Sequence, residues 1–121
     1  MNKIQNLVLR EDSAEWNYNN KKVVVPLEKI EQAEISDLTN SVYVLLKGDR
    51  LPSILKIFSE TGHEIETTSA PEGFQFYYLT QHPDLGVSIV CVTSNPIEGW
   101  RDWHFGYDFN KRSLFRHCPA Y

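Results

Sequence analysis

The sequence predicts a single α+β domain in which one main helix covers a mostly antiparallel sheet of about six to eight strands. Many short apolar segments alternate with polar residues and are separated by turn residues, which is typical of antiparallel strands. One segment, residues 51–61, instead has the spacing of a helix. The 121 residues suffice for one hydrophobic core, and no repeat or linker divides them, so residues 1–121 are taken as one domain.

The first third of the chain reads as strands joined by tight turns. Residues 3–10 and 15–18 are candidate strands, and Asn19-Asn20 is suited to the reversal into residues 23–25 because Asn tolerates positive φ. Residues 27–37 fit both a helix and a strand. We favour a short turn that leads into a strand.

The middle of the chain is predicted to contain a central strand and the covering helix. Within residues 42–48, the segment 43–46 is apolar on both faces, as in a strand at the centre of a sheet. In the predicted helix, Pro52 fits the first turn and Gly62 provides the positive φ of a helix end. Its apolar stripe follows the spacing i, i+3, i+4 and i+7 and consists of Leu51, Ile54, Leu55 and Phe58.

The last half of the chain is predicted to form three further antiparallel elements. Residues 63–68 alternate as an exposed strand whose main inward residue is Ile65. Residues 74–80 and 87–93 form a hairpin, because the intervening residues 82–86 include Pro and Gly.

A strand of alternating aromatic residues precedes the C-terminus. It carries Trp103, Phe105, Tyr107 and Phe109 on one face, so this face must be buried against the domain's own core or a partner. The strand reverses at residues 110–111 into 113–117. A two-residue turn pairs Tyr107 with Leu114, whereas a three-residue loop pairs it with Phe115. Within the aromatic strand, Gly106 indicates a bulge or a large ring that crosses the strand.

Charge and cysteine content restrict the class of protein. The net charge of −4 has the wrong sign for a nucleic-acid-binding protein and favours a basic partner. No signal peptide and no membrane span are apparent, so we expect a cytoplasmic protein with no membrane partner. Cys91 and Cys118 are read as free thiols that do not complete a zinc site of the usual spacing. No glycine-rich phosphate loop is present, and no cofactor is expected.

The best catalytic candidate is a pair of histidines on the C-terminal hairpin. With a two-residue turn, His104 faces His117, and Asp108 faces Ser113. Two imidazoles are able to act as general acid and base, or to hold a metal together with Asp108, with Lys111 or Arg116 stabilising charge. His117 and Cys118 are expected on opposite faces of their strand, which separates them. Because this candidate depends on one register, we assign no catalytic and no metal-binding residue.

A second candidate is a partner-binding surface of acidic and aromatic residues. Acidic runs often form only a solvated face, but an acidic patch also docks basic proteins, with Trp and Tyr as anchors. The predicted partner-binding residues are Glu28, Glu31, Glu34, Asp37, Glu60, Glu64, Glu66, Glu72, Trp100, Asp102 and Tyr121.

The combination of small size, acidity and β-rich pattern resembles the small bacterial immunity proteins that neutralise polymorphic or contact-dependent toxins. The local match is Gly99-Trp100-Arg101-Asp102-Trp103-His104-Phe105-Gly106-Tyr107-Asp108, which is similar to the closing strand of such domains. The resemblance implies a non-enzymatic domain that binds and blocks a basic toxin, for example a nuclease. Two alternatives are a small hydrolase or nuclease that uses His104 and His117, and a ligand-binding adaptor. The adaptor is suggested by residues 7–46, which look like the first half of a pleckstrin-homology-like barrel. The oligomeric state is left open.

Overall fold

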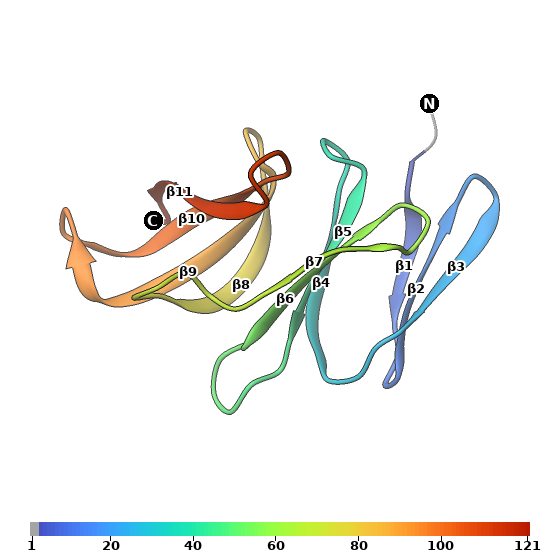
Figure 1. The fold of residues 1–121 in the computed structure, drawn as a ribbon, viewed down its shortest axis with the longest axis horizontal. Coiled ribbons are helices and arrows are strands. Elements are labelled where there is room, and N and C mark those ends of the chain that lie inside the picture. The colour runs from blue at the N-terminus through green and yellow to red at the C-terminus, as the bar shows by residue number, and fades with distance from the viewer. Residues whose placement is uncertain (1–2) are drawn as a thin grey trace.

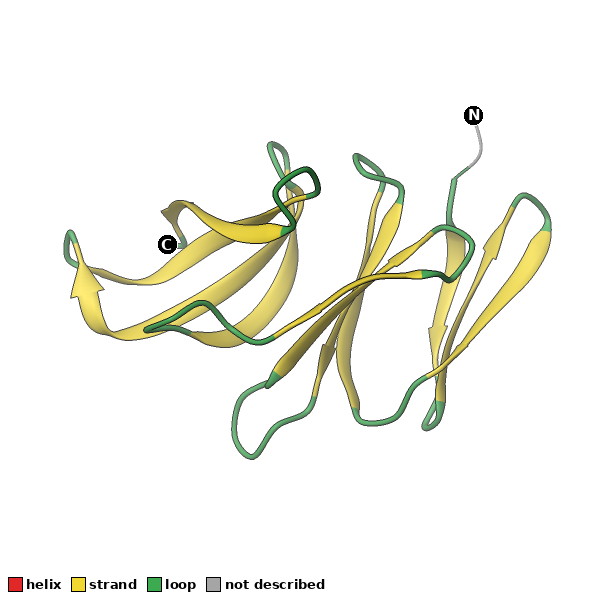
Figure 2. Cartoon of the chain, in the orientation of Figure 1, coloured by secondary structure: helices red, strands yellow, loops and turns green. Residues whose placement is uncertain are grey.

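A computed structural model describes residues 3–121, and this part of the chain forms eleven strands and no helix (Figure 2). The strands form three antiparallel sheets that follow one another along the molecule (Figure 1). We call these sheets A, B and C; in hydrogen-bonded order they are β1-β2-β3, β4-β5-β6-β7 and β11-β10-β9-β8. The strands are β1 (Gln5–Leu9), β2 (Ser13–Tyr18), β3 (Lys21–Pro26), β4 (Ile30–Ser36), β5 (Ser41–Leu46), β6 (Ile54–Ser59), β7 (Glu64–Thr68), β8 (Gln75–His82), β9 (Gly86–Ile97), β10 (Trp100–Asp108) and β11 (Ser113–Pro119).

The predicted α+β class is therefore wrong, and so is the helix at residues 51–61. These residues contain β6, which pairs with β5 on one side and β7 on the other. Leu55 and Ile57 belong to one hydrophobic core and Phe58 to another. Because β6 is buried on both faces, its apolar residues are nearly continuous, and such a run is not distinguished from a helix by periodicity alone. The structure has eleven strands where six to eight were expected, and β6 is one of the additional strands.

Sheet B is the middle layer, and it separates two cores. In β5, Tyr43 and Leu45 pack with sheet C, whereas Val42 and Val44 pack with sheet A. All four side chains are almost completely buried. This confirms the prediction of a central strand that is apolar on both faces.

The turn at Asn19-Asn20 joins β2 to β3 as predicted, with φ angles of 56° and 61°. From β2, Trp16 packs on Phe58 of sheet B and donates its indole N–H to the Glu60 carbonyl at 2.8 Å. Residues 27–37 lead into β4, as we favoured. The segment at residues 7–46 is thus divided between sheets A and B.

Sheet C contains the two predicted C-terminal hairpins. Tyr107 pairs with Leu114 and Asp108 with Ser113, which is the register of the two-residue turn. The aromatic side chains of Trp103, Phe105 and Tyr107 are buried in the core shared with sheet B. The alternating face is therefore explained by the domain's own core.

On one long side of the contact between sheets B and C, the side-chain amides of Gln32 and Gln81 form hydrogen bonds between the two sheets; we call this pair of contacts the amide seal. The Gln32 amide of edge strand β4 accepts from the Leu79 backbone N–H at 2.7 Å and donates to its carbonyl at 2.8 Å. Next to it, the Gln81 amide donates to the Ile35 carbonyl at 2.9 Å. The two edges, β4 and β8, thus protect each other's backbone groups, which would otherwise be open to other chains.

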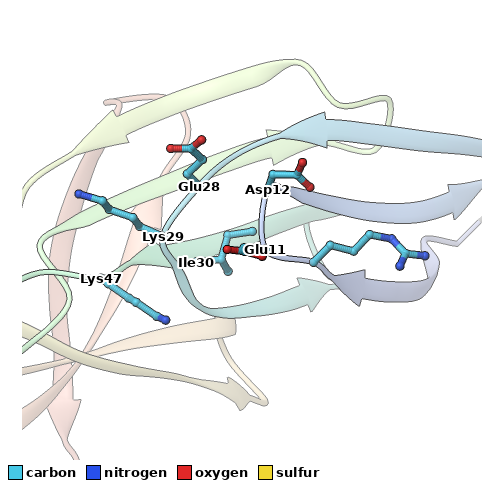
Figure 3. A pocket seen from close by; sticks show the side chains of 7 residues that line it. Glu11, Asp12, Glu28, Lys29, Ile30 and Lys47 are labelled. Carbon is cyan, nitrogen blue, oxygen red and sulfur yellow. The ribbon is translucent and has the colours of Figure 1, made fainter.

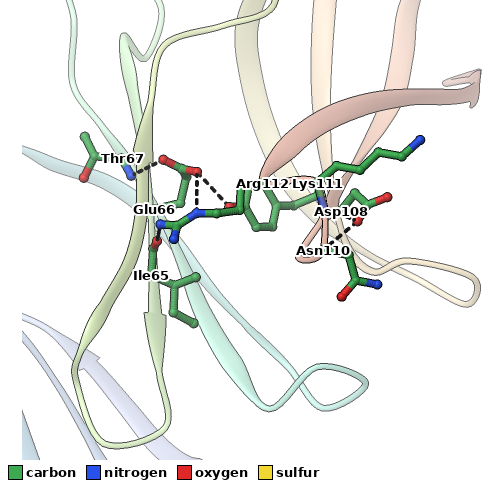
Figure 4. Close-up of polar contacts among 8 residues, drawn as sticks. Ile65, Glu66, Thr67, Asp108, Asn110, Lys111 and Arg112 are labelled. Carbon is green, nitrogen blue, oxygen red and sulfur yellow. Dashed lines mark hydrogen bonds and ion pairs between the residues drawn. The ribbon is translucent and has the colours of Figure 1, made fainter.

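The opposite side of the same contact is joined by a polar clamp at the β10–β11 turn (Figure 4). The Tyr107 hydroxyl donates to Glu66 Oε2 of β7 at 2.7 Å. The Arg112 guanidinium donates to the Ile65 carbonyl at 2.8 Å and lies 4.0 Å from the same Glu66 oxygen. Burial and the Glu66 carboxylate together raise the pKa of Tyr107 to about 12.

The described residues include no helix of the length and apolar character that a membrane span needs.

Replacement of Gln32 by Leu tests the amide seal. Leu79 would lose the partners of its N–H and C=O groups, and an unsatisfied buried polar group costs about 1–3 kcal/mol. We expect the free energy of unfolding in urea to fall by about that amount. Glu31→Leu, which introduces the same side chain at the exposed neighbouring position, should change it by less than about 0.5 kcal/mol. Equal effects of the two substitutions would contradict the seal.

Replacement of Tyr107 by Phe tests the polar clamp. Removal of the hydrogen bond to Glu66 should lower the free energy of unfolding by about 1 kcal/mol at neutral pH, because Glu66 is partly solvated. The raised pKa means that the folded chain holds the phenolic proton more tightly than the unfolded chain. This contribution to stability is complete below pH about 10 and is lost as the pH rises towards 12. Urea unfolding from pH 8 to 12 should therefore show a smaller loss for Tyr107→Phe than for the wild type. Tyr77→Phe, at an exposed position, serves as the control at neutral pH.

Candidate functional site

Three histidines converge on the face of sheet C that points away from sheet B. His82 ends β8, His104 lies on β10, and His117 lies on β11. The centroid of the His82 ring is 4.8 Å from that of His104 and 5.3 Å from that of His117. Because β8 and β11 are the two edges of the sheet, this contact requires the sheet to curl until its edges approach.

A β-bulge in β11 brings a fourth side chain, Cys118, into this group. His104 pairs with Cys118 and Phe105 pairs with Arg116, so His117 is the extra residue. The ligand atoms of His82, His117 and Cys118 all lie within 4.8 Å of one another. The expectation that neighbouring residues 117 and 118 are held apart on opposite faces is therefore wrong, because the bulge interrupts the alternation. For the same reason His104 faces Cys118 instead of His117.

Each histidine in the cluster has a polar partner. Ser88 Oγ is 2.7 Å from His104 Nδ1, and Asp84 Oδ2 is 3.3 Å from His117 Nε2. The Asp84 backbone N–H donates to His82 Nδ1 at 3.1 Å. Burial, followed by the nearby His82 and His117 side chains, lowers the pKa of His104. A neutral imidazole is therefore favoured at His104.

The side chains that we expected beside the histidines have other contacts. Asp108 Oδ1 accepts the backbone N–H groups of Asn110 and Lys111, both at 2.9 Å, and so shapes the β10–β11 turn. The Arg116 guanidinium lies over the Trp103 ring, 4.6 Å from its centroid. The carboxylate at the cluster is that of Asp84.

The absence of a side chain at Gly106 leaves room for two apolar side chains, Phe115 and Leu85, to pack on the outer face of sheet C. A Cβ atom at Gly106 would lie 2.6 Å from Phe115 Cζ and 2.8 Å from Leu85 Cδ2. The Phe115 ring therefore crosses the strand at this glycine, as predicted. Leu85 belongs to the same turn as Asp84, so this close approach holds the β8–β9 turn over the sheet.

The predicted acidic residues do not form a single surface. Glu28, Glu31, Glu34 and Asp37 lie on or beside edge strand β4, whereas Glu60, Glu64 and Glu66 lie on or beside β7 at the other edge of sheet B. Four of these carboxylates have partners within the chain. Lys56 forms an ion pair with Glu64 at 2.7 Å and lowers the pKa of Glu64. Gln81 donates a hydrogen bond to Glu34, Asn40 donates one to Glu60, and Glu66 belongs to the polar clamp. Within residues 3–121, no ion pair involves Glu28, Glu31, Asp37 or Glu72.

The predicted aromatic anchors do come together. The Trp100 and Tyr121 side chains are 40% and 91% exposed, and their rings meet nearly at right angles with centroids 4.5 Å apart. The Ala120 N–H donates to the Asp102 carbonyl at 2.8 Å, which fixes the C-terminal tail beside β10. Trp100 and Tyr121 thus form one small surface, here called the aromatic tip, and the Asp102 backbone holds the tail beside it.

A hollow of about 620 Å³ lies between the β1–β2 and β3–β4 turns (Figure 3). Its lining mixes three cationic side chains with three carboxylates and one apolar residue; it consists of Arg10, Glu11, Asp12, Glu28, Lys29, Ile30 and Lys47. In Figure 3 the charged ends of Asp12, Glu28 and Lys29 point in different directions. The hollow is neither the basic nor the apolar pocket that the ligand-binding adaptor would need.

No family model, no curated protein and no solved structure matches this chain.

Sequence reasoning identified His104, His117, Trp100, Asp102 and Tyr121, but it missed the other members of the histidine cluster. His82, Asp84 and Ser88 belong to the predicted hairpin at residues 74–93, far from the C-terminal strand in sequence. Only the curl of sheet C brings His82 and Asp84 to His117, whereas Ser88 meets His104 from the neighbouring strand β9. No periodicity within the hairpin indicates that contact.

The two thiols should differ sharply in reactivity. Cys91 is fully buried, and burial raises its pKa to about 12, so its thiolate is scarce at neutral pH. Cys118 is only half-buried. A chromogenic disulfide reagent should therefore modify one thiol per folded chain at pH 8 and a second only after unfolding. Cys118→Ser should abolish the rapid reaction. A rapid reaction that persists in this variant would contradict the assignment.

Proposed function

We propose that the chain is a non-enzymatic, cytoplasmic protein-binding domain that blocks a basic protein, as immunity proteins block nuclease-like toxins. The observation that carries this proposal is the aromatic tip. Its two large rings are exposed and already packed on each other, so little side-chain freedom remains to be lost on binding. Trp and Tyr are also the side chains that most often dominate interface energetics.

The charge of the chain favours a basic partner. Asp102 lies on β10 two residues from Trp100, and Glu98 lies in the turn just before Trp100. Glu28, Glu31, Asp37 and Glu72 add to the net charge of −4. We assign these residues to long-range attraction, which raises the association rate, and assign the energetic anchors to Trp100 and Tyr121. Glu60, Glu64, Glu66 and Glu34 are not assigned to binding, because they stabilise the fold.

The test starts with capture of the tagged chain from cells that express the genes beside its own. We expect a stoichiometric basic protein that is toxic when it is expressed alone. The double variant Trp100→Ala/Tyr121→Ala should weaken that complex by at least about 30-fold, as expected for the loss of a hot spot worth 2 kcal/mol or more, and should no longer protect cells. The association rate constant should fall as salt rises, because screening weakens the attraction.

Tyr77 and Tyr78 provide a matched control. They are 47% and 39% exposed and form a similar edge-to-face pair with centroids 5.0 Å apart. The double variant Tyr77→Ala/Tyr78→Ala should bind and protect like the wild type. If the Trp100/Tyr121 variant also retains full affinity, the proposed anchor is wrong. An association rate that does not change with salt would contradict the electrostatic part.

A second candidate function is general acid–base hydrolysis, for example of a phosphodiester, by His104 and His117. Its specific support is that both rings pack on His82 and each has its own polar partner, Ser88 or Asp84. If His104→Ala/His117→Ala leaves every hydrolytic activity of the purified chain unchanged, this candidate is eliminated.

A further inference from the structure

We infer that His82, His117 and Cys118 form a binding site for a single zinc ion that joins the two edges of sheet C. This inference goes beyond the proposed function and does not depend on it. The spacing of the cysteines in the sequence predicts no such site. The site arises only because the curled sheet brings β8 against the bulge of β11.

The donor set fits zinc. Two imidazoles and one thiolate are typical ligands of this ion, and three protein ligands leave a fourth position for water. With Zn–N bonds of about 2.0–2.1 Å and a Zn–S bond of about 2.3 Å, tetrahedral coordination separates the ligand atoms of two histidines and one cysteine by roughly 3.3–3.6 Å. The three ligand atoms already lie within 4.8 Å of one another. His117, the most exposed of the three, lies on the bulge, where rotation of its side chain can supply the remaining approach.

Outer contacts of the site resemble those that orient metal ligands. The Asp84 carboxylate is 3.3 Å from His117 Nε2, so His117 can donate this N–H and direct Nδ1 to the ion. His104 packs against the ring of His82, and the hydrogen bond between Ser88 and His104 Nδ1 orients the His104 ring, so this contact restricts the position of the ligand His82. One contact opposes binding: the Asp84 backbone N–H occupies the His82 Nδ1 lone pair. Coordination through His82 Nε2 therefore requires a proton to move to Nδ1 and this hydrogen bond to break.

The zinc ion would cross-link β8 and β11, two strands that share no backbone hydrogen bond. β8 and β11 are separated in the sheet by β9 and β10. A bond network through zinc would fix the curl of the sheet directly. Zinc should therefore bind the folded chain in preference to the unfolded chain and raise its thermal stability.

The experiment uses the full chain without a histidine tag, reduced with a phosphine and stripped with a chelator. Calorimetric titration with zinc should give one ion per chain. Titration with cobalt should give the near-ultraviolet charge-transfer band of a thiolate-bound ion. Zinc should also slow the modification of Cys118 by the disulfide reagent.

Matched variants identify the ligands. Cys118→Ser and His82→Gln should each abolish stoichiometric zinc binding and the thermal shift. Asp84→Asn should weaken zinc binding by about 10–100-fold. His63→Ala, at an exposed histidine outside the cluster, should bind zinc like the wild type. Circular dichroism of each apo variant separates loss of the site from loss of the fold. The inference is overturned if the wild type binds no zinc in stoichiometric amount. It is equally overturned if binding survives in folded Cys118→Ser and His82→Gln.

Discussion

The whole architecture depends on the burial of sheet B on both faces. Its central strands β5 and β6 send alternate side chains into two cores, one shared with sheet A and one with sheet C. A sheet with two apolar faces cannot be stable alone in water, and here each face is covered by another sheet. No further sheet covers the other face of sheet C, and this face carries the histidine cluster.

Local patterns in the sequence predicted much of the fold where one face of a strand is buried. The Asn19-Asn20 turn, the hairpin around Pro83 and the buried face of Trp103, Phe105 and Tyr107 all follow from turn chemistry and strict alternation. The pattern failed at residues 54–59, where burial on both faces removes the alternation. The bulges at Tyr77 and His117 were also beyond prediction. A one-residue insertion exposes both Tyr77 and Tyr78, and nothing in the local sequence marks it.

The candidate sites were predicted only as far as their parts are close in sequence. Trp100 and Asp102 lie on one strand, and Tyr121 reaches Trp100 because the neighbouring strand β11 returns there. The acidic residues at intervals of three would share a helix face, but on the alternating strand β4 this interval sends successive residues to opposite sides. Distant segments meet at His82 and His117 through the curl of a four-stranded sheet, which is a global property.

The strand order of the three sheets has a consequence for folding kinetics. Every backbone pairing joins strands that are consecutive in the chain, so each sheet is a simple meander. Hairpins of this kind close within microseconds, and no long loop has to be closed, at a cost in chain entropy, before the strands pair. Only the stacking of the three meanders needs distant segments, such as Gln32 and Leu79. Because its sheet pairings are all between consecutive strands, this chain should fold faster than a sandwich of equal length whose strands cross between sheets.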